Sequence, residues 1–181
     1  MMRYAGMISA DVGNGPDVCA TLFVQGCSHH CKGCFNPETW DFNGGQIWNR
    51  RTEYQFIEAC KKEYVKNICI LGGEPLDQGE SLIKLLNNLK KEIDKPIWLW
   101  TGYILEDIIF SRMPHPPEHT ESEFLIWNQR KEIVSLCDVI IDGPFIEELK
   151  KQLKYRGSSN QRIIDVKKTL ENGKIILYQE C

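Results

Sequence analysis

The sequence predicts an α/β fold in which helices connect the strands of a parallel sheet. Short apolar runs of strand length alternate along the chain with segments in which apolar residues recur at helical spacing. This alternation is typical of repeated β-α units. The later runs each end at a glycine-containing turn, where a strand would stop. Because 181 residues is the length of one domain, we expect a single domain over residues 1–181 and an incomplete rather than a closed eight-fold barrel.

The first β-α unit begins with the apolar run at residues 19–25, which is rich in Thr, Leu, Phe and Val. After a loop, residues 52–55 match the capping-box pattern of a helix N-terminus, a Thr followed three positions later by a Gln. The first crossover helix is therefore expected to begin there and to bury one apolar face. That face comprises Phe56, Ile57, Cys60 and Tyr64.

The second and third units repeat the pattern. Residues 67–71 form a buried-strand run that ends at Gly72-Gly73, and residues 97–100 form another that ends at Thr101-Gly102. A long amphipathic helix is expected after the first run and a short one after the second. Their apolar stripes are Leu82, Leu85, Leu86, Leu89 and Ile93 in the long helix, and Leu105, Ile108 and Ile109 in the short one.

The last third of the chain starts with a break. Residues 112–120 contain three prolines and no apolar periodicity, so we expect a loop there, and a helix over residues 123–136. Residues 138–141 read as a fourth clear strand, which Asp142-Gly143-Pro144 stops. Further along we expect candidate strands at residues 163–166 and 175–178 and a loop at residues 157–160.

Composition and charge exclude several classes of protein. The net charge is −3 and the sequence pI about 5.8, so no basic field is available to hold nucleic acid by its phosphates. The longest apolar runs are strand-sized and far shorter than the roughly 18–20 residues that span a bilayer. Residues 1–10 lack the apolar core of a signal peptide. We therefore expect a cytoplasmic protein that contacts neither nucleic acid nor membrane.

Three of the eight cysteines form a tight group in a loop that follows an apolar strand. Cys27, Cys31 and Cys34 are separated by four and three positions. In the cytosol such a group is more often a metal or redox site than a set of disulfides. Thiolates are soft ligands suited to iron-sulfur clusters, and one short loop can supply three corners of a [4Fe-4S] cubane. The fourth iron would then stay open for a substrate.

The spacing by itself leaves a second interpretation open. A structural zinc ion could be held by the same thiols with His29, His30 or Cys19 as the fourth ligand. Such sites usually comprise two ligand pairs separated by a longer stretch, and no second pair is evident. The cluster is therefore the favoured interpretation.

Motifs throughout the chain resemble the radical-SAM enzymes. The Cys-x3-Cys-x2-Cys group is followed by the aromatic Phe35, and Gly72-Gly73-Glu74-Pro75 resembles the motif that follows the second strand in those enzymes. More closely, the chain resembles the anaerobic ribonucleoside-triphosphate reductase activating proteins from about residue 14 to residue 161. That likeness rests on Asn14-Gly15-Pro16, Trp100-Thr101-Gly102-Tyr103, Asp142-Gly143 with Phe145, and residues 156–161. Residues 112–130 and 171–181 depart from the family pattern.

The resemblance implies a fold and a set of ligands. The fold would be a partial (βα) barrel of the radical-SAM type with a curved, mostly parallel sheet, and the cluster loop would follow its first strand. The three cysteines would ligate the cluster, and the amino and carboxylate groups of S-adenosylmethionine would chelate the fourth iron. The expected cofactor contacts are Gly72, Gly73 and Glu74 on the amino side, Gly33, Cys34 and Phe35 on the adenine side, and Thr101 and Asp142 at equivalent strand ends.

The resemblance also implies an activity. Reductive cleavage of S-adenosylmethionine would give methionine and a 5′-deoxyadenosyl radical, which would generate a glycyl radical on the large subunit of an anaerobic ribonucleoside-triphosphate reductase. A low-potential donor such as flavodoxin or ferredoxin would supply the electron. Two alternatives are a radical-SAM enzyme acting on a small molecule, similar to a deazaguanine synthase, and a non-enzymatic interaction module stabilised by zinc.

Other reactive residues have simpler interpretations. His29 and His30 are expected to be solvent-facing spacers in the cysteine loop, and His115 and His119 to lie in an ordinary surface loop. The cysteines on apolar runs are expected to be small buried hydrophobes, whereas Cys181 is a candidate redox thiol. Those buried cysteines are Cys19, Cys60, Cys69 and Cys137.

Overall fold

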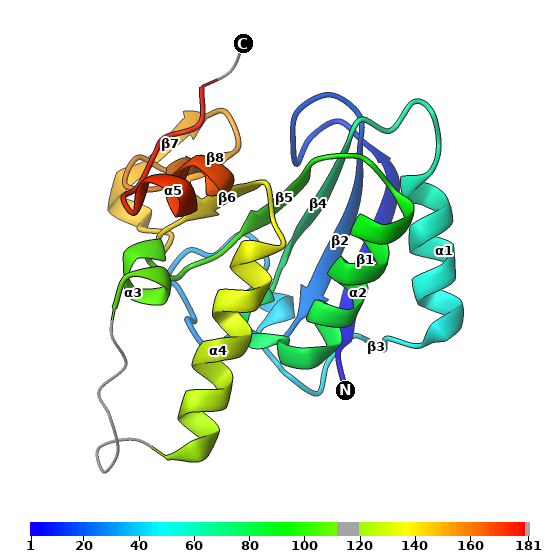
Figure 1. Cartoon of the computed structure of the whole chain (residues 1–181), viewed down its shortest axis with the longest axis horizontal. Helices are drawn as coiled ribbons and strands as arrows, with labels where there is room; N and C mark the ends of the chain where they lie inside the picture. Colours follow the sequence, from blue (N-terminus) through cyan, green and yellow to red (C-terminus); the bar gives the residue numbers. More distant parts are fainter. Residues whose placement is uncertain (112–119, 180–181) are drawn as a thin grey trace.

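The computed structural model describes residues 1–111 and 120–179, and within them the strands form one large sheet and one small one (Figure 1). The large sheet has seven strands in the order β3-β1-β2-β4-β5-β6-β9, and β7 and β8 form a separate hairpin. The strands are β1 (Arg3–Asp11), β2 (Cys19–Gln25), β3 (Gln46–Ile47), β4 (Asn67–Gly72), β5 (Ile97–Trp100), β6 (Val139–Asp142), β7 (Lys150–Leu153), β8 (Arg156–Ser158) and β9 (Arg162–Asp165).

The centre of the large sheet is parallel, as predicted. Strands β2, β4, β5 and β6 run side by side in the same direction, and each was expected from an apolar run. The two edges are antiparallel, because β1 and β3 pair on one side and β9 pairs with β6 on the other. The structure is therefore a mixed α/β fold with a parallel core.

Helices cover one face of this sheet. The side chains of each strand alternate between the two faces, so one strand can contribute to two separate clusters. In β4, Ile68 and Ile70 belong to the main core beneath the helices, whereas Cys69 and Leu71 belong to a smaller cluster on the opposite face. Figure 1 shows α1, α2 and α4 side by side in front of the strands. The helices are α1 (Arg50–Cys60), α2 (Gly79–Glu92), α3 (Leu105–Ile109), α4 (Glu121–Ser135) and α5 (Val166–Asn172), with short 3₁₀ turns η1 (Pro37–Thr39), η2 (Pro75–Asp77) and η3 (Glu147–Leu149).

The predicted start of the first helix is wrong by about one turn. Helix α1 begins after Asn49, whose side chain accepts hydrogen bonds from the backbone N–H groups of Arg51 and Thr52. Asn is among the best N-cap residues, and here it leaves Thr52 inside the first turn, so the capping box at residues 52–55 does not form. Tyr64 lies beyond the helix and is exposed.

The structure differs from the sequence-based expectations in four further places. Strand β1 was not predicted, because Gly6 and two register shifts interrupt its alternation. The loop expected at residues 157–160 is partly strand, since β8 pairs with β7. The strand expected at residues 175–178 is reduced to one bridge between Leu177 and Ile164. The helix expected at residues 123–136 is α4, which the capping box of Thr120 and Glu123 starts slightly earlier.

On the sheet face opposite the helices, the chain leaves a hollow. Trp98, Val139 and Ile141 pack there with Cys19 and Cys69. The β7–β8 hairpin and the segment around Tyr178 lie over this cluster, since Trp98 stacks edge-on against Tyr155 and Tyr178. Within the described residues, no helix has the length and apolar content needed to cross a membrane.

Candidate functional site

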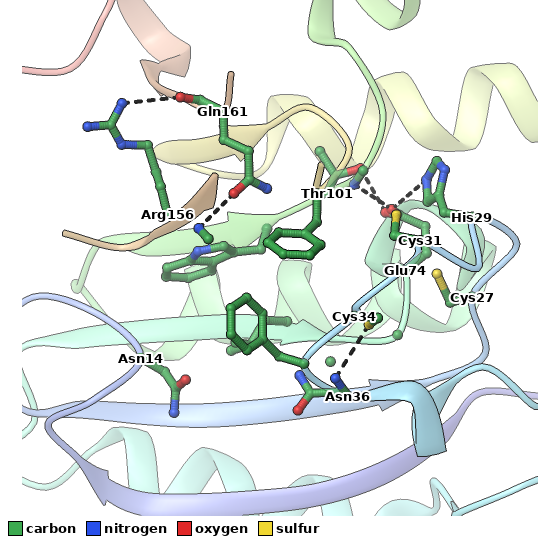
Figure 2. Close-up of a pocket in the computed structure, with 18 of the residues that line it drawn as sticks. Asn14, Cys27, His29, Cys31, Cys34, Asn36, Glu74, Thr101, Arg156 and Gln161 are labelled. Atoms are coloured by element: carbon green, nitrogen blue, oxygen red, sulfur yellow. Dashed lines mark hydrogen bonds and ion pairs between the residues drawn. The ribbon is translucent and has the colours of Figure 1, made fainter. Parts of the chain in front are cut away.

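A cavity of about 610 Å³ opens at the carboxyl ends of the parallel strands, on the face without helices (Figure 2). Its volume lies in the range of roughly 300–1,000 Å³ that is usual for small-molecule sites. Gly72 from β4, Thr101 after β5 and Gly143 after β6 line it together with the loop that follows β2. Carboxyl ends of adjacent parallel strands are the usual place for ligands in α/β folds.

The cysteine loop forms one end of this cavity. Cys27, Cys31 and Cys34 all line it, and none of them is in a disulfide. Figure 2 shows the three sulfur atoms around the same end of the hollow. Burial raises the pKa values of the Cys27 and Cys31 thiols, and the backbone N–H of Asn36 lies 3.4 Å from the Cys34 sulfur, to which it donates a hydrogen bond.

This donor set fits an iron-sulfur cluster. Three soft thiols from one loop line one end of a cavity, and a backbone N–H points at one sulfur, an interaction that tunes iron-sulfur clusters. Among residues 1–111 and 120–179, no three His, Cys, Asp or Glu side chains converge closely enough to hold one metal ion. The single-zinc alternative therefore gains no support from the geometry.

Glu74 is the most heavily bonded side chain of the site. It is 1% exposed, and its carboxylate accepts four hydrogen bonds. Oε1 accepts from the Leu76 backbone N–H and the Thr101 hydroxyl, at 2.9 and 2.8 Å. Oε2 accepts from the Gly102 backbone N–H at 2.8 Å and faces Nε2 of His29 at 3.0 Å. The carboxylate thus holds the ends of β4 and β5 together rather than lying free in the cavity.

The interpretation of His29 as a solvent-facing spacer is wrong. Its side chain is only 20% exposed, lines the cavity and stacks edge-on against the ring of Tyr103, with centroids 4.4 Å apart. The hydrogen bond to Glu74 raises the pKa of His29 above its ordinary value. His30, by contrast, is exposed and contacts Trp40. The sequence could not separate the two histidines because their difference depends on a residue 45 positions away.

The two glycines at the end of β4, Gly72 and Gly73, permit close contact between backbones. A Cβ added to Gly73 would lie 2.3 Å from the carbonyl oxygen of Gly26, and Gly72 has a φ of +109°. The Gly73 N–H donates to the Val24 carbonyl and the Glu74 N–H to the Gly26 carbonyl. These bonds fix the end of β4 directly against the start of the cysteine loop, which is why no larger side chain fits.

The other end of the cavity explains motifs for which the sequence offered no mechanism. The Gln161 side chain accepts hydrogen bonds from the N–H groups of Gly157 and Ser158 and donates to the Gly143 carbonyl, which ties the hairpin to the end of β6. A Cβ on Gly157 would lie 2.9 Å from Phe35 and 3.0 Å from Phe145. Residues 156–161 therefore hold the β7–β8 hairpin as a wall of the cavity.

Not every predicted contact lies on the cavity. Gly72, Gly73, Glu74, Thr101, Cys34 and Phe35 line it, whereas Gly33 and Asp142 do not. The buried carboxylate of Asp142 accepts hydrogen bonds from the Arg162 guanidinium and the Leu105 backbone N–H. Asp142 thus has a role within the protein, between β6, β9 and α3. The sequence could not predict this role of Asp142, because Arg162 belongs to no recognisable motif.

The other histidines and cysteines agree with the sequence predictions wherever the structure describes them. The four cysteines on apolar runs are all buried, as expected. His115, His119 and Cys181 lie outside the described residues. Besides Phe35, four aromatic residues line the cavity and were not predicted as a group: Phe23, Trp100, Phe145 and Tyr155.

Comparison with known proteins agrees with this geometry. Residues 13–164 match the family model described as a 4Fe-4S single cluster domain. The chain is 35% identical over 166 residues to the anaerobic ribonucleoside-triphosphate reductase-activating protein of Escherichia coli K12, covering 88% of this chain and 96% of the relative. The proteins of the same name from Enterobacteria phage T4 and Haemophilus influenzae are 33% and 35% identical, over 90% of this chain and 93% and 97% of their own lengths.

The chain belongs to this family of activating proteins. The matched segment includes the three cysteines and every residue that lines the cavity. Family membership favours an iron-sulfur protein over the zinc-stabilised module, and an activating protein over a small-molecule enzyme.

Proposed function

We propose that this protein is a radical-SAM activating enzyme for an anaerobic ribonucleoside-triphosphate reductase. The observation that carries the proposal is the meeting of three free thiols and the Gly72-Gly73-Glu74 strand end on one cavity of ligand size. The names of the relatives supply the class of target, and the matched family supplies the cluster.

The fold we propose is a partial (βα) barrel forming one domain over the whole chain. In support, the helices cover one face of the parallel strands and the cavity lies on the other, as a barrel with an interior ligand requires. The antiparallel strands β1 and β3 at one edge and β9 at the other would leave the barrel open at its sides.

Within this cavity, Cys27, Cys31 and Cys34 would hold a [4Fe-4S] cluster and leave one iron open. When bound, the reduced cluster supplies one electron that splits the sulfonium of S-adenosylmethionine into methionine and a 5′-deoxyadenosyl radical. Gly72 and Gly73, whose missing Cβ atoms make room for the backbone of β2 and Gly26, would fix the strand end that the ligand amino group approaches. Thr101 keeps Glu74 in place, since its hydroxyl donates to that carboxylate.

The aromatic residues would bind the adenosyl group and limit water. Phe35 and Phe145 stack edge-on with centroids 5.1 Å apart, beside Trp100 and Tyr155. Phe35 is 59% exposed in the structure, so a ligand that stacks on it would also bury it.

The deoxyadenosyl radical would take a hydrogen atom from a glycine of the reductase large subunit, leaving the glycyl radical there. We propose no contact between the ligand and Gly33 or Asp142, because neither residue lines the cavity.

The setting we propose is cytoplasmic, where flavodoxin or ferredoxin can supply a low-potential electron. In support, none of the described cysteines forms a disulfide, as expected in a reducing compartment.

The test is an anaerobic assay of 5′-deoxyadenosine. The protein is reconstituted with iron and sulfide, reduced and given S-adenosylmethionine, with Cys31→Ala and Cys60→Ala variants in parallel. Cys60 is buried in the main core and away from the cavity, so it controls for the loss of a thiol as such. We expect product from the wild type and Cys60→Ala and none from Cys31→Ala. Addition of the reductase should then yield the electron paramagnetic resonance doublet of a glycyl radical. A fully loaded wild type that makes no product with the reductase present would refute the proposal.

A further inference from the structure

His29 connects the cysteine loop to the strand ends by a side-chain bond. It lies two residues after Cys27 and two before Cys31, yet its ring extends away from the loop to Glu74. The ring packs closely on the backbone there, because a Cβ on Gly102 would lie 2.6 Å from it. Figure 2 shows His29 and Thr101 directed at Glu74 from opposite sides.

The other hydrogen bonds to Glu74 come from the strand-end side of the cavity. Leu76 follows β4, and Thr101 and Gly102 follow β5. Among the described residues that bond this carboxylate, His29 alone comes from the loop that carries the thiols. Its removal would leave Oε2 with the Gly102 N–H and would break the link between loop and carboxylate.

The bond of His29 uses the nitrogen that is further from the backbone. Nε2 faces Glu74, and Tyr103 covers the side of the ring. A buried side-chain hydrogen bond to a charged partner is one of the stronger single interactions in a protein and is directional. It can therefore fix the distance between the thiol loop and the glycines at the end of β4.

We infer that His29 is a positioning residue, which holds the cysteine loop and the Gly73-Glu74 strand end at the separation that S-adenosylmethionine must bridge. This inference rests on the proposed function. In this role the imidazole of His29 touches neither the reacting bond nor the thiols, whereas the backbone N–H of the same residue bonds the Cys27 sulfur. The imidazole acts through Glu74, so its loss should weaken binding of S-adenosylmethionine more than it weakens the fold.

Two amide variants test whether a hydrogen-bond donor at the position of Nε2 is enough, without the imidazole ring. Gln places a nitrogen at about the position of Nε2, whereas Asn places one at about the position of Nδ1 and cannot reach Glu74. His29→Gln and His29→Asn are therefore compared, with His30→Ala as the matched control in the same loop. The measurements are KM for S-adenosylmethionine and kcat in the deoxyadenosine assay, iron and sulfide content, and the change that S-adenosylmethionine causes in the electron paramagnetic resonance spectrum of the reduced cluster.

We expect His29→Asn to raise KM about tenfold, which corresponds to about 1.4 kcal/mol. His29→Gln should stay within about threefold of the wild type, and His30→Ala should be unchanged. Since KM does not depend on the fraction of active protein, partial loss of cluster does not obscure the comparison. The spectral change should need correspondingly more S-adenosylmethionine in His29→Asn.

Equal KM values for Asn, Gln and wild type would overturn the inference. So would complete loss of cluster from both amide variants, because His29 would then serve cluster retention rather than binding of S-adenosylmethionine. If the loaded wild type makes no deoxyadenosine, the proposed function fails first. The inference about His29 is then judged on the titration of the cluster spectrum with S-adenosylmethionine. If the spectrum changes in none of the proteins, the inference is overturned as well.

Discussion

At residue 73 the structure requires a glycine for reasons of backbone contact. A Cβ there would lie 2.3 Å from the Gly26 oxygen and 2.9 Å from the Gly26 carbonyl carbon, and both of these are main-chain atoms. No side-chain rotation can relieve that contact, so the end of β4 and the cysteine loop would have to separate.

We therefore expect Gly73→Ala to lower the cluster content after reconstitution to less than half of the wild-type value. Gly6→Ala is the matched control, because a Cβ at Gly6 meets nothing within 4 Å. Iron and sulfide analysis of both variants checks this. Full cluster content in Gly73→Ala would show that the loop position is less constrained than the contacts indicate.

The residue scale is also where sequence interpretation was weakest. The three cysteines and the glycine pair were found because each motif is contiguous. The bonds from His29 and Thr101 to Glu74 join residues 45 and 27 positions apart, and no local pattern reports such contacts. Asp142 was placed on the ligand side by position alone, and its bond to Arg162 was invisible in the sequence.

At the scale of elements, Arg162 joins β9, β6 and α3. Its guanidinium donates to the fully buried Asp142 and, by two bonds of 2.7 and 2.6 Å, to Glu106. Removing it leaves a buried carboxylate without its cation, which typically costs about 3–5 kcal/mol. We expect Arg162→Met to lose stability of that order in urea unfolding. Lys84→Met, which breaks an exposed pair with Glu80, should cost less than about 1 kcal/mol. Similar losses in the two variants would contradict this assignment.

The same group of charges predicts an acid-dependent loss of stability. The hydrogen bond from Arg162 lowers the pKa of Glu106 below its ordinary value. A lowered pKa in the folded state means that the stabilisation is complete above the unfolded-state pKa of about 4.3 and is lost as pH falls through the folded-state value. The difference in melting temperature between wild type and Glu106→Gln should therefore be constant from pH 7 to 5 and shrink below about pH 4. A difference that persists at pH 3 would exclude this pair as its source.

Elements differed in how well the sequence predicted them. The four parallel strands are buried on both faces, so each appears as a continuous apolar run. The antiparallel strand β1 and the hairpin strands β7 and β8 are partly exposed and contain polar residues or glycine. For these strands pairing, rather than composition, decides the structure, so their residues gave no comparable signal.

At the scale of the whole molecule, the cavity lies between parts of the chain that are far apart in sequence. The cysteine loop forms one end, the strand ends its floor, and the β7–β8 hairpin its wall. A ligand that fills it would contact all three parts and so stabilise the folded state. At 100 times the dissociation constant this effect is about 2.7 kcal/mol, and each kcal/mol raises the melting temperature of a chain of this size by about 2–4 °C.

We therefore expect S-adenosylmethionine to raise the melting temperature of the cluster-loaded protein by about 5–10 °C under anaerobic conditions. Cys31→Ala should show a much smaller rise, because its cluster site lacks one thiol and the cavity would lose the iron that we propose as the ligand's anchor. Differential scanning fluorimetry of both proteins, with S-adenosylmethionine and with adenosine as a ligand without the amino acid part, measures the difference. An equal rise in both proteins would mean that the cavity binds the adenosyl group without the cluster. No rise in the loaded wild type would mean that the cavity is not the binding site for S-adenosylmethionine.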